Sequence, residues 1–254
     1  MLLKDEMAKD GDFLFRYRSY IPLVMIPLLI LSLLSFDQEL FSIGKNGRVD
    51  YNTPLVIVAL VVGCVGQWIR ILVAGYVPQG TSGRNVHGQV ANSLNTTGMY
   101  SLCRNPLYLG NFLMMIAPMI LLGNWLLLLA FGALFWIYYE RIIYTEERFL
   151  EGKFGEEYTK WAESTPAFFP SFKNYKKSVL GFSLKTMLKR EYHSFFGLTT
   201  SLLVANYLIV SISQEDWSIT VDPILLDVFI ASAVFYLIIR FIVKKTRYFH
   251  VEGR

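Results

Sequence analysis

Cysteine and histidine are scarce in this chain, whose 254 residues include two cysteines and three histidines. Cys64 lies deep in an apolar segment and Cys103 in a polar one, so a disulfide between them is not expected. His87, His193 and His250 are far apart and show no paired metal-ligand spacing. The sequence therefore predicts neither a disulfide framework nor a metal site.

Motifs of common soluble enzymes are also missing. The chain has no P-loop, no GxSxG turn and no GxGxxG turn. It lacks the long internal repeat that is typical of many transporters. Nucleotide hydrolysis by a P-loop and serine hydrolysis of the usual kind are therefore not indicated.

Apolar residues are abundant instead. The chain is 54% hydrophobic and 15% aromatic, with a mean hydropathy of +0.40. Because a spanning helix needs about 20 mostly apolar residues, we predict an all-α, polytopic membrane protein with about six transmembrane helices, including a tight helical hairpin at 107–144. The predicted spans are Tyr20–Phe36, Pro54–Val77, Leu107–Leu122, Trp125–Tyr144, Phe196–Ser213 and Pro223–Val243. A cleaved signal peptide is the alternative for the first span, although no small-residue cleavage site follows it.

Positive charge is distributed unevenly among the loops. With six spans, nineteen of the 24 Lys and Arg residues fall on the side that holds both termini, and only Lys45 and Arg48 fall on the other. This bias predicts that both termini and both flanks of the hairpin face the cytoplasm. The formal net charge of +4 follows from the same bias, so we expect contact with the bilayer and no nucleic-acid partner.

The pattern divides the chain into three parts. Residues 1–53 form a cytoplasmic leader, the first span and an outer loop, and residues 54–172 form a membrane core with a cytoplasmic site. Residues 173–254 form a basic linker and two C-terminal spans. Within the linker, Leu180–Leu188 has amphipathic character and is predicted to lie along the membrane surface.

Two polar clusters flank the predicted hairpin. They consist of Arg104, Asn105, Pro106 and Tyr108 before it, and of Glu146 and Glu147 after it. Folding the hairpin back brings both clusters to one membrane face, where an arginine can hold an anion and carboxylates can hold hydroxyls or an ammonium. Asn105 and Pro106 also suit a helix N-cap and first turn, which would direct free backbone N–H groups to that face. Because neighbouring helical residues diverge by about 100°, only one glutamate is expected to face the site fully.

Further polar residues lie near these clusters. The loop before Gly98 is rich in hydrogen-bonding side chains, and Arg84 and His87 are candidates for holding an anionic substrate. Arg70 lies roughly 10 Å below the end of its predicted span at helical rise. There it either snorkels towards the headgroups or lines a polar pocket together with Gln67.

An ordered series of residues around the hairpin resembles the superfamily of isoprenylcysteine carboxyl methyltransferases and phospholipid methyltransferases. The series is Arg104-Asn105-Pro106-Leu107-Tyr108-Leu109-Gly110, Glu146-Glu147, Leu150, Phe154-Gly155, Tyr158 and Pro170, and the resemblance covers about residues 54–172. The family usually has histidine where this chain has Asn105, which can donate a hydrogen bond but cannot carry charge.

The resemblance implies an S-adenosylmethionine-dependent methyltransferase whose cofactor comes from the cytoplasm and whose lipid substrate comes from the bilayer. Arg104, Asn105, Pro106 and Tyr108 would hold the methionine end of the cofactor. Glu146 and Glu147 would hold its ribose or amino group, with Gly98 and Tyr100 lining the same site. The stretches Thr81–Arg84 and Asn95–Gly98 are similar to a bacterial branch associated with lipid A phosphate methylation, which implies the inner membrane of a bacterium.

Methyl transfer from a sulfonium is a displacement for which alignment in a dry pocket supplies most of the catalysis. An anionic oxygen needs no general base, so a lipid phosphate oriented by Arg84, His87 and Arg104 is the favoured acceptor. The alternatives are the carboxyl group of a prenylated cysteine and the amine of a phospholipid headgroup. An NADPH-dependent membrane reductase, and a scaffold or transporter without enzymatic activity, are the competing classes.

Overall fold

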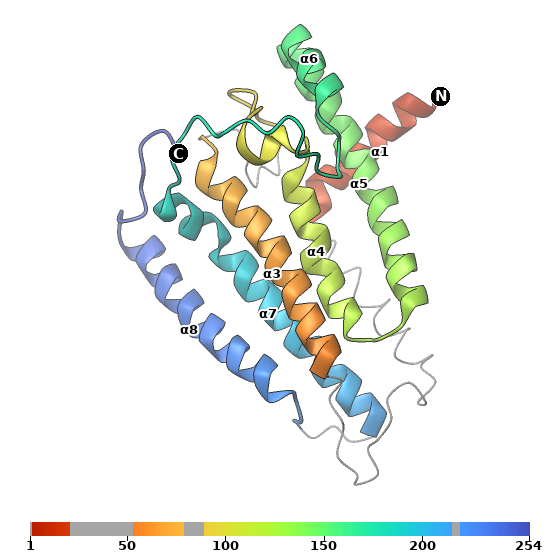
Figure 1. Cartoon of the computed structure of the whole chain (residues 1–254), viewed down its shortest axis with the longest axis vertical. Coiled ribbons are helices and arrows are strands. Elements are labelled where there is room, and N and C mark those ends of the chain that lie inside the picture. The colour runs from red at the N-terminus through yellow and green to blue at the C-terminus, as the bar shows by residue number, and fades with distance from the viewer. Residues whose placement is uncertain (1, 21–52, 79–88, 215–218) are drawn as a thin grey trace.

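A computed structural model describes residues 2–20, 53–78, 89–214 and 219–254 (Figure 1). Within these ranges every regular element is a helix, as the all-α prediction requires. The elements are α1 (Leu3–Tyr17), η1 (Arg18–Tyr20), α3 (Thr53–Tyr76), η3 (Gly98–Ser101), α4 (Pro106–Ile120), α5 (Trp125–Phe154), α6 (Glu156–Ser164), α7 (Leu184–Gln214) and α8 (Pro223–Lys245).

Four helices, α3, α5, α7 and α8, are long and apolar enough to cross a membrane, and the chain is an integral membrane protein. The predicted span Leu107–Leu122 corresponds to α4, which has 15 residues. At helical rise this is about 22 Å, shorter than the hydrocarbon core of about 30 Å. The predicted first span, Tyr20–Phe36, lies outside the described residues except for Tyr20. The predicted number of six spans is therefore not confirmed.

The helices α4 and α5 form the predicted hairpin. Gly123 turns the chain with a φ of +64°, a left-handed conformation that glycine adopts without strain. Asn124 then caps α5, because its side-chain oxygen accepts a hydrogen bond from the Leu127 N–H at 3.1 Å. The turn at Gly123 and Asn124 thus sets where α5 begins.

Helix α5 is longer than the predicted span, which ended at Tyr144. It continues to Phe154 and ends where Gly155 adopts a φ of +52°. Residues 145–154 include no proline and one glycine, so nothing in them stops the helix before Gly155. Glu146 and Glu147 therefore lie in the last turns of a 30-residue helix, near its C-terminal end.

Helix α7 is also longer than predicted and has 31 residues. The segment Leu180–Leu188, predicted to be a separate surface segment, is divided at Leu184, where α7 begins. Ser183 caps this start, since its hydroxyl accepts a hydrogen bond from the Thr186 N–H at 3.3 Å. No proline or glycine lies between Leu184 and Phe196, so the basic linker residues continue directly into the apolar helix.

Close backbone contact joins α3 to α4. A Cβ atom built on Gly66 would lie 2.7 Å from the carbonyl oxygen of Gly110, and one on Gly110 would lie 2.9 Å from that of Gly66. Small residues at such contacts let membrane helices approach backbone to backbone. Helix α7 packs against α3, α8 packs against α7, and α1 lies against α5 (Figure 1). The two ends of the chain lie at the end of the bundle where α6 projects.

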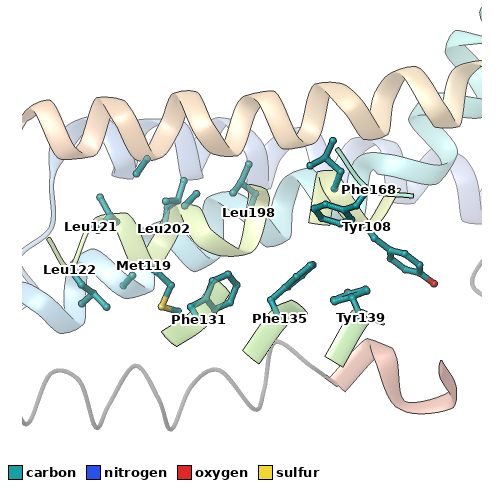
Figure 2. Close-up of a cluster of buried hydrophobic side chains, with 14 of the residues drawn as sticks. Tyr108, Met119, Leu121, Leu122, Phe131, Phe135, Tyr139, Phe168, Leu198 and Leu202 are labelled. Carbon is teal, nitrogen blue, oxygen red and sulfur yellow. The ribbon is translucent and has the colours of Figure 1, made fainter. Parts of the chain in front are cut away.

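Aromatic side chains fill the space between α4 and α5 (Figure 2). Phe131, Phe135 and Tyr139 follow one another at helical spacing on α5, and Phe135 stacks on Tyr139 with ring centroids 4.1 Å apart. Tyr108 of α4 lies against Tyr139 at 4.7 Å. None of these rings is more than 9% exposed. The row extends from the apolar core to Tyr108, one of the predicted site residues.

Candidate active site

The two segments that flank the hairpin lie against each other, as the sequence predicted. The backbone N–H groups of Arg104 and Asn105 donate to the carbonyl oxygens of Pro166 and Ala167 at 2.8 and 3.1 Å. Further along, the Gly98 N–H donates to the Lys176 carbonyl oxygen at 2.8 Å. These bonds hold residues 98–105 against the segment that follows α6, so both polar clusters occupy one end of the bundle.

Arg104 connects three elements at this end. Its Nε donates to the Glu147 carboxylate at 2.8 Å, and its Nη1 donates to the carbonyl oxygens of Ala162 and Thr165, each at 2.7 Å. The two side chains of the ion pair are 17% and 27% exposed. A guanidinium at the C-terminal end of α6 also interacts favourably with the carbonyls exposed there. Arg104 therefore fixes the start of α4 to α5 and α6.

Glu146 points to a different set of neighbours from Glu147. Its carboxylate lies within electrostatic range of the Tyr108 hydroxyl and of Arg18. Tyr139, whose ring lies against that of Tyr108, is also within electrostatic range of Glu146 and Arg18. The adjacent glutamates thus diverge as expected for helical neighbours: Glu147 contacts Arg104, and Glu146 faces the tyrosines.

Asn105 occupies the N-cap position of α4, and Pro106 follows at the first helical position, both as predicted. The capping hydrogen bond itself is absent, however, because the Asn105 side chain makes no bond to the α4 backbone. Its Nδ2 instead donates to the carbonyl oxygen of Ala167 at 3.0 Å. The amide therefore holds the segment after α6, a contact that the sequence pattern alone did not reveal.

Tyr100 lies at the edge of a cavity of about 270 Å³. The cavity is lined by the end of α3 near Tyr76, by residues 93–97 and by residues 178–180. The carbonyl oxygen of Tyr100 accepts a hydrogen bond from Trp161 Nε1 at 3.3 Å. Gly98, with a φ of +61°, turns the chain between this cavity and the Lys176 contact. Arg84 and His87, the other two predicted site residues, lie outside the described residues.

A buried polar network lies deeper between α3, α4 and α7. Arg70 Nε and Nη2 donate to the two oxygens of Glu191 at 2.8 and 3.0 Å. Arg70 Nη2 also donates to Ser194 at 3.0 Å, and Nη1 contacts Asn111. Gln67, which is 4% exposed, donates to Glu191 at 3.3 Å. Arg70 and Gln67 do share one helix face, and an anion on α7 meets them there.

Three contributors were missed by sequence reasoning. Arg18 and Glu191 come from outside the resembling segment, and both were counted only as loop charges or not considered. Tyr158 was named in the family-resembling series but given no role, yet its buried hydroxyl lies beside Glu147 and Arg104, and burial raises the pKa of this phenol well above its usual value. No local pattern reveals the contacts of these residues, since only packing brings their partners within reach.

No group of three or more His, Cys, Asp or Glu side chains suited to a metal ion occurs in the part of the chain that the structure describes. Cys103 lies beside the site with its side chain fully buried, and burial raises the pKa of its thiol to about 12. The thiol therefore stays protonated at neutral pH, which makes it a poor nucleophile and a poor metal ligand.

Comparison with known proteins places residues 55–157 in the phospholipid methyltransferase family. The chain is 31% identical to protein-S-isoprenylcysteine O-methyltransferase of Schizosaccharomyces pombe over 110 residues, which make up 42% of this chain and 46% of the relative. It is 33% identical to a probable protein of the same name from Oryza sativa subsp. indica over 119 residues, 44% of this chain and 60% of the relative.

A third relative carries a different name. The chain is 36% identical to the cobalt-zinc-cadmium resistance protein CzcN of Cupriavidus metallidurans over 91 residues, 36% of this chain and 42% of the relative. The chain spans about half the length of these curated relatives. No solved structure gives a significant match. The matched segment contains α3, η3, α4, α5 and the start of α6, hence Arg104, Tyr108 and both glutamates. The membrane core of this chain is therefore similar to isoprenylcysteine O-methyltransferases and to the phospholipid methyltransferase family.

Proposed function

We propose that this chain is an integral membrane methyltransferase that moves a methyl group from S-adenosylmethionine to an anionic oxygen of a lipid-linked substrate. The observation that carries the proposal is the arrangement at the end of the hairpin. There Arg104 is paired with Glu147, and Glu146 lies with Tyr108, all within the segment that matches a methyltransferase family.

The residues present suit a zwitterionic sulfonium cofactor. Glu146 offers a carboxylate to an ammonium group, and Tyr108 offers a hydroxyl beside it. The Tyr158 hydroxyl is buried, lies near Glu147, and has no partner at hydrogen-bond distance among the described residues. Since a buried polar group without a partner is costly, a ligand hydroxyl or carboxylate is a suitable partner for it.

The chemistry requires little acid–base assistance from the protein. When bound, S-adenosylmethionine supplies the methyl group: the new oxygen–carbon bond forms as the sulfur–carbon bond breaks, and S-adenosylhomocysteine leaves. An acceptor oxygen that is already anionic releases no proton, which agrees with Asn105 in place of histidine. The task of the chain is to orient the two reactants and exclude water. The links from Arg104 to Glu147, Ala162 and Thr165 give that orientation a rigid frame.

The acceptor is best proposed as a carboxylate, with a phosphate as the second choice. Two of the relatives reported above are named for O-methylation of an isoprenylcysteine, and neither they nor CzcN is named for phosphate methylation. Arg104, one of the residues considered for phosphate binding, is already engaged by Glu147, and Arg70 nearby is engaged by Glu191. Fewer positive charges therefore remain for a dianionic group than the sequence suggested.

The first experiment identifies the cofactor. Protein purified in detergent is heated with S-adenosylmethionine, S-adenosylhomocysteine or NADPH, and its melting temperature is compared with that of the protein alone. The proposal requires a rise with the two sulfur cofactors, because a ligand that binds only the folded state stabilises it. A rise with NADPH alone would replace methyl transfer by the reductase alternative.

The second experiment identifies the acceptor. Purified enzyme and methyl-labelled cofactor are incubated separately with a prenylcysteine, phosphatidic acid, lipid A and phosphatidylethanolamine. Labelling of prenylcysteine as a base-labile ester is the expected result, and labelling of lipid A or phosphatidic acid would move the acceptor to phosphate. Preferential labelling of phosphatidylethanolamine would refute the anionic-oxygen mechanism.

A further inference from the structure

The N-terminal helix α1 is attached to the site rather than extending freely from the bundle. The Tyr138 hydroxyl of α5 donates to the carbonyl oxygen of Leu14 at 3.0 Å, and the Thr145 hydroxyl donates to that of Ala8 at 3.3 Å. Phe15 is 6% exposed and belongs to the main apolar core. These contacts run along α5 from Tyr138 to Thr145, so α1 lies on α5 next to the turn that carries Glu146.

A glycine makes this close contact possible. A Cβ atom on Gly11 would lie 2.0 Å from the Thr145 hydroxyl oxygen and 2.3 Å from the Arg141 carbonyl oxygen. Any side chain at this position would therefore have to displace backbone as well as side-chain atoms. An ion pair between Asp10 and Arg141 at 3.5 Å adds to the contact. The position of α1 on α5 is thus specific, because the two backbones meet at one residue.

Arg18 lies one turn beyond Leu14, directly after α1, and is near the predicted cofactor residues. Its Nη1 donates to the Phe15 carbonyl oxygen at 2.8 Å, and its guanidinium lies 3.7 Å from the centre of the Phe15 ring. The guanidinium lies within electrostatic range of Glu146, Tyr108 and Tyr139. Figure 2 shows the Tyr108 hydroxyl directed towards the region where α1 runs. Glu147 is therefore paired with Arg104, and Glu146 has Arg18 as a nearby positive charge.

We propose that α1 is a working part of the active site and that Arg18 is a positioning residue, which holds the Glu146 carboxylate and the Tyr108 hydroxyl in the arrangement that binds the cofactor. This inference rests on the proposed function. It adds an element that lies outside the matched residues 55–157, so this chain builds one wall of the site from its own N-terminal segment. Phe15 orients the guanidinium, and Gly11 sets the distance between α1 and α5.

Binding of S-adenosylmethionine to the full chain in detergent, measured by calorimetry, tests the inference. Arg18→Ala should weaken binding by about tenfold, equivalent to about 1.4 kcal/mol, because Glu146 and Tyr108 lose the positive charge near them. Arg18→Lys should recover most of the affinity, because the charge is kept. Arg16→Ala is the matched control: Arg16 lies on the exposed side of α1, two residues away, and its loss should leave binding unchanged.

A second variant tests the helix independently of the charge. Gly11→Leu should push α1 off α5 and weaken cofactor binding as much as Arg18→Ala, while the apolar bundle keeps its helical circular dichroism. Wild-type affinity in Arg18→Ala, or equal losses in Arg18→Ala and Arg16→Ala, would overturn the inference. Failure of the wild-type chain to bind S-adenosylmethionine would instead overturn the proposed function, so the two failures are distinguishable.

Discussion

Replacing Glu191 with leucine should destabilise the folded protein strongly, because it leaves the Arg70 guanidinium buried without its counter-ion. The two side chains are 6% and 14% exposed, and the carboxylate accepts two hydrogen bonds from the guanidinium and one from Gln67. Removing one partner of a buried ion pair costs about 3–5 kcal/mol. For a chain of this size that corresponds to a loss on the order of 10 °C in melting temperature.

The double variant Glu191→Leu with Arg70→Met separates this effect from simple loss of contacts. Because a buried pair can often be replaced by apolar side chains at little cost, it should be more stable than Glu191→Leu alone. Lys189→Leu is the matched control, since Lys189 is exposed on the same helix and should change stability by no more than about 0.5 kcal/mol.

Unfolding of these variants can be followed with a thiol-reactive fluorescent dye. In a Cys64→Ala background, the remaining thiol is that of Cys103, whose side chain is fully buried and becomes accessible on unfolding. A melting temperature for Glu191→Leu equal to that of Lys189→Leu would refute the reasoning. A double variant less stable than either single variant would also refute it, because the pair would then contribute net stability.

Three further predictions concern the site and its orientation. Arg104→Ala and Glu147→Gln should each weaken S-adenosylmethionine binding by about tenfold or more, and the double variant should be little worse than the single ones, because both break one ion pair; additive losses in calorimetry would show that the residues act separately. The Cys103 thiol should resist maleimide from pH 7 to pH 9, since burial raises its pKa to about 12 and keeps it protonated; rapid labelling of the folded protein at pH 8 would contradict its placement. Cysteine introduced at Lys176 should be protected from an impermeant reagent in intact cells, and labelling from outside would overturn the cytoplasmic orientation of the site.

Much of the hairpin could be predicted from residue order. Gly123 and Asn124 are a turn and a helix cap by their local chemistry, and Asn105 with Pro106 marks the start of α4 for the same reason. Such signals act over a few residues, so the sequence contains them directly. The ends of α5 and α7 were predicted wrongly, because apolar run length was used as the limit. Helix α5 continues through charged residues to its C-terminal end at Gly155. Helix α7 starts earlier than predicted, among charged residues, where Ser183 caps it.

The partners of the charged residues were less predictable. Asn105 was expected to cap α4, yet it binds Ala167, since the segment after α6 approaches the same N-terminus. Arg70 was expected to snorkel or to line a pocket, and it meets Glu191 more than 100 residues further along the chain. A polar side chain in a membrane protein must find a partner, but the sequence does not say which one is within reach.

The sequence by itself determined the class of the protein, the hairpin and the gathering of two polar clusters at one end, because composition, periodicity and turn chemistry are local properties. The tertiary structure alone decided which charges meet: Glu147 pairs with Arg104, Glu191 pairs with Arg70, and Glu146 lies near Tyr108 and Arg18. Electrostatic energy depends on distance in space, and these distances follow from helix packing, including the contact of α1 with α5 at Gly11.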